Sequence, residues 1–218
     1  MAHAGRFSLY LITDRKLARG GGIVEACAQA LSAARETAPD IGVAVQLREK
    51  DLTGRQLYAL GREFRAVCSR FGALLTVNDR IDVALACDAD GIHLPADSFS
   101  PAEARRMLGP ARLIGVSAHS VSDLEHAERE GADFAVYGPV YAPLSKAGSG
   151  AACGVDGLAE GCRATRLPVF ALGGITVERT RELRASGAAG VAVIGAVFGA
   201  DSPADATRAL LRAIRDNL

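Results

Sequence analysis

Short runs of apolar residues recur eight times along this chain, and many of them end in polar residues or glycine. The runs are FSLYLIT (7–13), GVAVQLR (42–48), ALLTVND (73–79), GIHL (91–94), RLIGVS (112–117), FAVYGP (134–139), VFALGG (169–174) and GVAVIGAV (190–197). Unbroken apolar strands are typical of a parallel sheet that is covered on both faces. Segments with helical periodicity lie between most of them. The repeated order of strand, loop and helix predicts an α/β fold, a (β/α)8 TIM barrel.

Helix-start signals support this interpretation. In the clearest segment, apolar side chains recur at three- and four-residue steps: Leu57, Leu60, Phe64, Val67 and Phe71. Thr53 and Gln56 precede them with the spacing of a capping box, and similar starts occur at Ser100, Ser120 and Ser202. The interval between the third and fourth runs has room only for a short helix. We therefore expect one barrel domain over residues 1–218. An open doubly wound sheet is the competing architecture, but no G-x-G-x-x-G follows the first run.

Composition excludes some classes of function. Lys plus Arg and Asp plus Glu number 25 each, so the formal net charge is zero. Bulk charge gives no support for nucleic-acid binding, and any anion site must come from local placement of cations. The five cysteines are an odd number without a C-x-x-C pair, which fits a reduced cytoplasm. The first apolar run is broken at Thr13-Asp14 before it reaches the length of a membrane span, so no membrane association is expected.

Polar residues gather where the predicted strands end. They are Thr13, Asp14, Gln46, Arg48, Lys50, Asn78, Asp79, His93, Ser117 and His119. Reactive groups of such barrels lie at the carboxyl ends of the strands. This clustering predicts an enzyme.

The stretch QLREK (46–50) carries the sharpest signal. If the strand continues through it, Gln46, Arg48 and Lys50 point to one side. An arginine fork and a lysine on one face suit phosphate oxygens. The competing interpretation is a surface cluster, in which Glu49, Asp51 or another carboxylate pairs with both cations.

Three further features each allow a structural and a functional interpretation. Asn78-Asp79 suits Mg²⁺ bound together with phosphates, but it is also common turn and helix-cap chemistry. The Gly-rich segment 137–157 contains Ser145-Lys146, which either closes over a phosphate or lies in solvent. His93 and His119 are acid–base groups or hydrogen-bonded structural residues.

Several motifs, taken together and in order, resemble the thiamine phosphate synthase and thiazole tautomerase superfamily over nearly the whole chain. They are YLITD (10–14), QLREK (46–50), VNDRIDVAL (77–85), ADGIHL (89–94), IGVSAHS (114–120), GADFAVYGPVY (131–141), ALGGIT (171–176) and GVAVIGAVF (190–198). The resemblance implies a transferase that couples hydroxymethylpyrimidine diphosphate to hydroxyethylthiazole phosphate and releases diphosphate in thiamine biosynthesis. The implied partners are these small phosphorylated molecules. Assembly into a homo-oligomer is compatible with the resemblance.

The resemblance also implies a site. Its pyrimidine diphosphate part comprises Gln46, Leu47, Arg48, Glu49, Lys50, Asn78, Ser117 and Lys146. Its thiazole phosphate part comprises Pro143, Leu144, Ser145, Gly174, Ile194 and Gly195. Magnesium is expected at Asp79 and at the position of Ser98. Arg48, Lys50, Lys146, Ser117 and His119 are the implied catalytic residues.

The chain departs from the synthase pattern after the fourth run. HLPADS (93–98) places Ser98 where a synthase usually has a second metal-binding aspartate, and Asp97 is a neighbouring substitute. The same stretch is similar to the tautomerase branch, whose acid–base residue corresponds to His119. Arg48, Lys50, Asn78, Asp79 and Lys146 favour the synthase, because a tautomerase has no diphosphate to hold. A tautomerase acting through His119 and a non-catalytic binder of thiamine-pathway phosphates are the alternatives.

Overall fold

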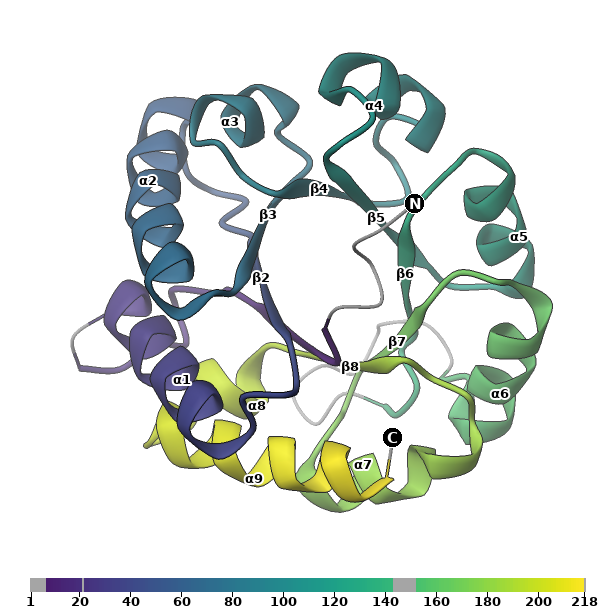
Figure 1. Ribbon diagram of the computed structural model, residues 1–218. Helices are drawn as coiled ribbons and strands as arrows, with labels where there is room; N and C mark the ends of the chain where they lie inside the picture. Colours follow the sequence, from purple (N-terminus) through teal and green to yellow (C-terminus); the bar gives the residue numbers. More distant parts are fainter. Residues whose placement is uncertain (1–6, 21, 143–151, 218) are drawn as a thin grey trace.

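The eight predicted strands close into one parallel barrel, and the helices surround it (Figure 1). The computed structural model describes residues 7–20, 22–142 and 152–217. The strands are β1 (Leu9–Ile12), β2 (Val43–Leu47), β3 (Leu74–Asn78), β4 (Gly91–Leu94), β5 (Leu113–Ala118), β6 (Phe134–Tyr137), β7 (Val169–Leu172) and β8 (Gly190–Val193). Each strand pairs in parallel with its neighbours in sequence, and β1 pairs with β8 to complete the ring. The (β/α)8 prediction is confirmed.

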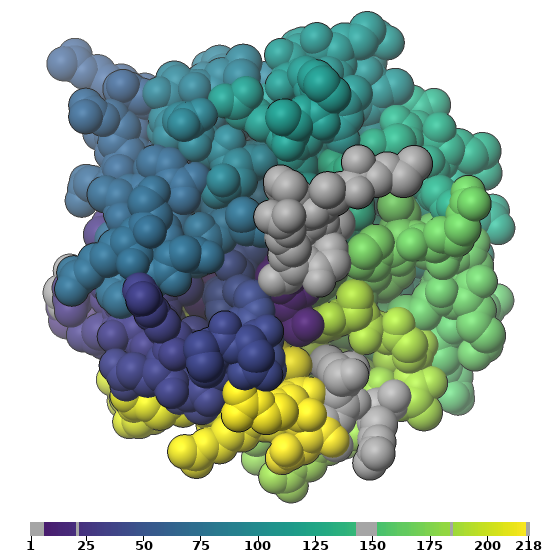
Figure 2. Space-filling view, viewed as in Figure 1, coloured from purple at the N-terminus to yellow at the C-terminus, as the bar shows by residue number. Residues whose placement is uncertain are grey.

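Helices follow the strands in the predicted alternation. They are α1 (Ile23–Thr37), α2 (Gly54–Phe71), α3 (Ile81–Ala86), α4 (Pro101–Leu108), α5 (Val121–Arg129), α6 (Gly154–Ala164), α7 (Val177–Glu182), the 3-10 turn η2 (Leu183–Ala185), α8 (Gly195–Phe198) and α9 (Pro203–Asn217). Helix α1, indigo, and helix α9, yellow, come from opposite parts of the chain and lie side by side (Figure 2). Their packing brings the two ends of the repeated pattern together.

The predicted helix starts are confirmed. Complete capping boxes precede three helices, with Thr53, Ser100 and Ser120 as the cap residues. The Ser202 hydroxyl accepts a hydrogen bond from the Asp205 amide at 3.2 Å before α9. The crossover between β3 and β4 contains the six-residue helix α3, as its short interval requires. Within the described ranges, no helix is long and apolar enough to cross a bilayer. All five cysteines are free thiols.

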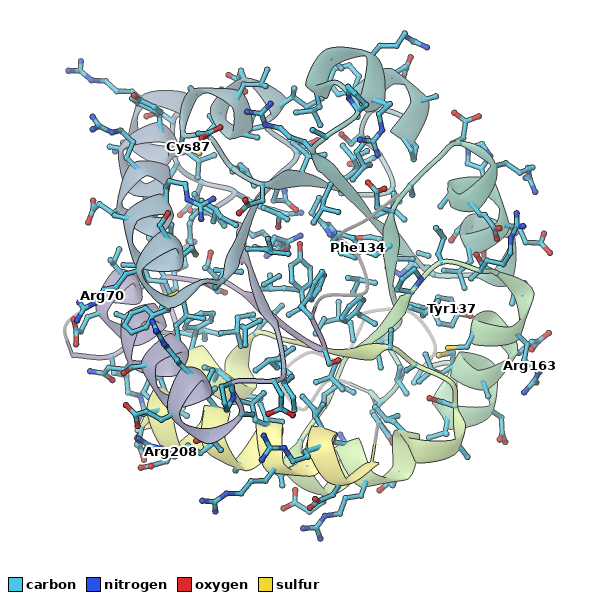
Figure 3. All side chains as sticks on the ribbon, viewed as in Figure 1. Arg70, Cys87, Phe134, Tyr137, Arg163 and Arg208 are labelled. Atoms are coloured by element: carbon cyan, nitrogen blue, oxygen red, sulfur yellow. The ribbon has the colours of Figure 1, made fainter. Side chains whose placement is uncertain are left out.

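An aromatic cluster fills the barrel interior near the amino ends of the strands. It consists of Phe7, Tyr10, Phe134 and Phe170. Phe7 stacks on Phe170 with ring centroids 4.6 Å apart, and Phe134 meets the Tyr10 ring edge-on at 5.5 Å. Phe134 lies inside the ring of strands, whereas Tyr137 lies outside it against α6 (Figure 3). A Cβ on Gly115 would lie 2.2 Å from the Phe134 ring, so glycine is required there. This packing leaves only the interior near the carboxyl ends of the strands, the mouth of the barrel, for polar groups.

Replacing Phe134 by alanine should lower the free energy of unfolding by ~3–5 kcal/mol, because it empties a fully buried position of the barrel. Urea unfolding measures this change. Phe99→Ala is the matched control, because Phe99 is 50% exposed and should change stability by less than about 0.5 kcal/mol. Equal midpoints for the two variants would contradict the role given to the aromatic cluster.

Candidate active site

The interior of the barrel mouth is polar on one side and apolar on the other. Strand side chains alternate between the inside and the outside of a barrel, so their interior positions can be read from the register. On β2 to β5, the upper interior positions are polar: Gln46, Thr76, Asn78, His93 and Ser117. On β1, β6 and β7 they are apolar, Ile12, Val136 and Leu172, and apolar Ile194 directly follows β8. The mouth can therefore hold a polar group beside an apolar one.

QLREK is arranged differently from its predicted form. Strand β2 ends at Leu47, so only Gln46 occupies an interior strand position, and Arg48 to Lys50 begin the loop after it. The prediction of one continuous strand face is wrong beyond Leu47. The Arg48 amide donates to the Thr13 hydroxyl at 2.9 Å, and the Thr13 amide donates to the Gln46 carbonyl at 2.9 Å. Fully buried Thr13 thus fixes the loop that carries Arg48.

The carboxylates beside Arg48 and Lys50 pair with other cations. Glu49 accepts the Arg15 amide at 3.0 Å and also the Arg15 guanidinium. Asp51 accepts from Arg15 at 2.5 Å and from Lys16 at 3.0 Å. The hydrogen bonds from Arg15 hold the pKa of the Asp51 carboxyl well below its usual range. The interpretation in which Glu49 or Asp51 neutralises Arg48 and Lys50 is therefore wrong.

Glu49 is only 5% exposed, and both its oxygens bond to Arg15. These contacts give Glu49 a structural part in the loop after β2. Leu47 likewise belongs to the core between the strands and the helices. The other three residues of this stretch, Gln46, Arg48 and Lys50, take no part in these ion pairs.

Gln46 adds a buried polar group to the mouth. Its side chain is 1% exposed and interacts with the Tyr10 hydroxyl. Within the described part of the chain its Nε2 has no other hydrogen-bond partner. An acceptor atom of a ligand at the mouth would give this amide a further one.

Asn78 and Asp79 do not cap the helix that follows. Arg80 is the N-cap residue of α3, and no side chain makes a cap hydrogen bond there. Asp79 adopts a positive φ of 64°, which is uncommon for a residue with a Cβ. Its carboxylate accepts a short hydrogen bond from the Ser98 hydroxyl. Ser98, and not Asp97, is therefore the residue that meets Asp79.

Ser98 and Ser117 line one cavity of about 200 Å³, together with Leu94, Phe99 and Asp123. The cavity lies between the β4–α4 loop, with the first residue of α4, and helix α5, from which Asp123, His126 and Ala127 line it. Arg48 and Lys50 do not line it, but the positive charge of Arg48 acts on His93, whose Nε2 lies 3.0 Å from the Ser117 hydroxyl. The Arg48 charge and the His93–Ser117 contact thus connect the segments after β2, on β4 and on β5.

His93 is a buried structural histidine. Burial, with a smaller contribution from the Arg48 charge, lowers the pKa of His93 to about 3, so the ring is neutral at physiological pH. His119 is exposed, and its Nδ1 lies 2.7 Å from the Gly138 carbonyl. A carbonyl only accepts, so Nδ1 carries a proton and, in the neutral ring, Nε2 keeps a free lone pair.

Three of the predicted thiazole phosphate residues, Gly174, Ile194 and Gly195, lie after the ends of β7 and β8. Gly173 and Gly174 have φ values of 103° and 63°, and a Cβ on Gly174 would lie 2.8 Å from Arg179. Arg179 donates to the Gly174 carbonyl at 2.7 Å and lies 4.5 Å from the centre of the Tyr141 ring. Ile194 precedes Gly195, the first residue of α8. Pro143, Leu144, Ser145 and Lys146 lie outside the described residues.

Sequence reasoning missed Tyr10 and Thr76. The Tyr10 hydroxyl lies 2.6 Å from the Thr76 hydroxyl and 3.3 Å from His93 Nδ1, and His93 contacts Ser117. Thr76 could have been predicted, because it lies two residues before Asn78 and so occupies the same strand face. Tyr10 reads as an ordinary core residue because no local pattern links β1 to β3 and β4.

The site matches a known family. The family model for thiamine monophosphate synthase matches residues 9–197. The chain is 41% identical to a thiamine-phosphate synthase of Roseiflexus castenholzii, over 95% of this chain and 88% of the relative. It is 38% identical to the thiamine-phosphate synthase of Moorella thermoacetica, over 94% of each chain.

Solved structures agree. A thiamine phosphate pyrophosphorylase from Pyrococcus furiosus superimposes with a TM-score of 0.85 at 33% identity, covering 99% of this chain and 98% of the other. A 3-hexulose-6-phosphate synthase reaches a TM-score of 0.64 at 19% identity, which shows the shared barrel fold alone. By its motifs, its barrel and these relatives, the chain belongs to the thiamine monophosphate synthase family.

Proposed function

We propose that this protein is a thiamine-phosphate synthase, which joins hydroxymethylpyrimidine diphosphate to hydroxyethylthiazole phosphate and releases diphosphate. The proposal rests mainly on the side chains of Arg48 and Lys50. Among the described residues neither side chain forms an ion pair, while the adjacent carboxylates Glu49 and Asp51 pair with Arg15 and Lys16. Cations that the protein leaves unpaired at a barrel mouth favour an anionic ligand.

The chemistry suits this site. When diphosphate leaves the pyrimidine methylene carbon, negative charge grows on the departing oxygens, and fixed cations stabilise that charge. The Arg48 fork is suited to two oxygens, and its backbone is held by Thr13 before substrate arrives. The thiazole nitrogen then forms the new bond to carbon, so the second contribution is the alignment of the two substrates. No side-chain nucleophile is required.

Magnesium fits the donors at the rim. The Asp79 carboxylate and the Ser98 hydroxyl are oxygen ligands in contact with each other. No cluster of three His, Cys, Asp or Glu residues exists in the ranges that the structure describes. One carboxylate is enough when phosphate oxygens and water complete the shell, which is how Mg²⁺ is usually held. Bound there, Mg²⁺ would supply positive charge against the diphosphate.

The direct test is incubation of the purified protein with both substrates and Mg²⁺, followed by detection of thiamine phosphate. We expect product formation that requires both substrates. Tight binding of the pyrimidine diphosphate without turnover would instead favour the non-catalytic binder. Absence of both binding and product would reject the proposal.

His119 supports a second candidate, the thiazole tautomerase. Its Nδ1 proton is held by the Gly138 carbonyl, which leaves Nε2 available to a substrate proton. Isomerisation of the thiazole carboxylate phosphate by the parent protein, abolished in His119→Gln, would favour this activity. Thiamine phosphate formation that is unchanged in His119→Gln would favour the synthase. The free cysteines fit the reducing cytoplasm as the site of either reaction.

Arg179 should determine affinity for the thiazole phosphate. It holds the Gly174 carbonyl and packs on Tyr141, and so keeps the β7–α7 turn in shape. We expect Arg179→Ala to raise the KM for thiazole phosphate by about tenfold, which is the loss of roughly 1.4 kcal/mol. The KM for pyrimidine diphosphate should not change. Arg181→Ala, an exposed arginine of the same helix, is the control. Parallel increases in both KM values would contradict this assignment.

A further inference from the structure

Four polar side chains form one hydrogen-bonded chain inside the barrel, and they come from four different strands. Thr76 of β3 meets Tyr10 of β1 at 2.6 Å, Tyr10 meets His93 Nδ1 of β4 at 3.3 Å, and His93 Nε2 meets Ser117 of β5 at 3.0 Å. We call Thr76, Tyr10, His93 and Ser117 the interior relay. Thr76 and Tyr10 are fully buried, and His93 is 3% exposed. Of the four, only Ser117, at the carboxyl end of β5, lines the cavity beside the β4–α4 loop.

Every member of the interior relay is neutral. Burial raises the pKa of the Tyr10 hydroxyl far above its ordinary value. The buried ring of His93 lies between two hydroxyls and has no carboxylate partner among the described residues. A neutral imidazole has one nitrogen that donates and one that accepts. The relay therefore has a direction, because the tautomer of His93 decides whether Ser117 gives its proton to His93 or receives a hydrogen bond from it.

The two directions end differently. If Ser117 donates to His93, the last proton of the relay, that of Thr76, points to the Val45 carbonyl at 3.4 Å, the longest contact of the set. In the opposite direction Thr76 donates to Tyr10 across the 2.6 Å contact, and Tyr10 donates to His93 Nδ1. His93 Nε2–H then donates to Ser117, whose own proton is free to point into the mouth.

The unpaired cations after β2 favour the second direction. Arg48, whose charge acts on His93, and Lys50 form no ion pair among the described residues, so both can offer N–H donors to a ligand. A site that presents several unused donors fits a ligand rich in acceptor oxygens, and a serine that donates completes such a set. A serine whose proton is taken by His93 would present lone pairs to the same oxygens and repel them.

We propose that Thr76, Tyr10 and His93 are positioning residues that turn the Ser117 hydroxyl proton toward the barrel mouth, where it donates to an oxygen of the pyrimidine diphosphate. This rests on the proposed synthase function for the identity of the ligand. The direction of the relay itself is a property of the free protein. Tyr10 and Thr76 act only through His93, and His93 acts through Ser117.

The tautomer is measured by ¹⁵N NMR of the free protein labelled at histidine, with the signals of His93 assigned by their loss in His93→Gln. We expect a pyrrole-type shift for Nε2 and a pyridine-type shift for Nδ1. The reverse pattern overturns the proposal. This readout needs no substrate, so it stands even if the protein makes no thiamine phosphate.

Activity gives the second readout. Tyr10→Phe keeps the ring in the aromatic cluster and removes only the hydroxyl that donates to His93. We expect kcat for thiamine phosphate formation to fall by roughly ten- to a hundredfold, because a hydrogen bond to the developing negative charge of the diphosphate is weakened but not removed. The KM for thiazole phosphate should not change. Tyr58→Phe, which removes an exposed hydroxyl on α2, is the matched control. Equal kcat values for the two variants would overturn the proposal while the synthase function stands.

Discussion

Arg48→Ala should lower kcat/KM for thiamine phosphate formation by roughly a hundred- to a thousandfold, the usual cost of removing one preorganised group from a developing anion. The guanidinium is free to meet the diphosphate because the described carboxylates nearest in sequence, Glu49 and Asp51, are held by Arg15 and Lys16. Steady-state kinetics with the pyrimidine diphosphate as the varied substrate measure the loss. Arg48→Lys keeps the charge but loses the fork, so it should recover only part of the rate.

The control for this experiment is Arg62→Ala, which removes an exposed arginine from α2. Its kcat/KM should equal that of the parent. A change in Arg48→Ala no larger than in Arg62→Ala would show that Arg48 does not meet the diphosphate. Unfolding midpoints of both variants should stay near that of the parent, because neither removes a buried apolar side chain.

The second large effect concerns magnesium. Chelation should abolish product formation, and added Mg²⁺ should restore it, because the Asp79 and Ser98 oxygens offer one charged ligand to the ion. Ser98→Asp places a second carboxylate beside the first. We expect the Mg²⁺ concentration for half-maximal rate to fall by about tenfold, equivalent to roughly 1.4 kcal/mol of added affinity. Titration of Mg²⁺ into the protein with inorganic diphosphate, followed by calorimetry, measures the same change without turnover.

Ser122→Asp is the control for Ser98→Asp. It adds the same charge on the first turn of α5, where no carboxylate ligand is proposed. Its magnesium curve should match that of the parent. If Ser98→Asp leaves the curve unchanged, or moves it to higher Mg²⁺, then Asp79 and Ser98 do not face a shared ion.

Much of the site follows from local pattern. The polar residues at the ends of β2 to β5 could be placed at one rim, because all strand ends of a parallel barrel meet on the same side. The period-two argument assumed a longer strand: β2 ends at Leu47, and the Arg48 amide bonds to the Thr13 hydroxyl, although the Arg48 charge still acts on interior His93. The helix-cap interpretation of Asn78-Asp79 failed because Asp79 takes a left-handed conformation, and Arg80 precedes the helix instead.

By itself, the sequence determined the number and order of the strand and helix units, the helix starts at Thr53, Ser100 and Ser120, and the short helix α3. These are properties of neighbouring residues, set by side-chain periodicity and local hydrogen bonds. Only the tertiary structure decided that Glu49 pairs with Arg15, and that Tyr10, Thr76, His93 and Ser117 join into one chain. Such contacts link residues far apart in sequence, and they depend on the closure and stagger of the barrel, which no local pattern encodes.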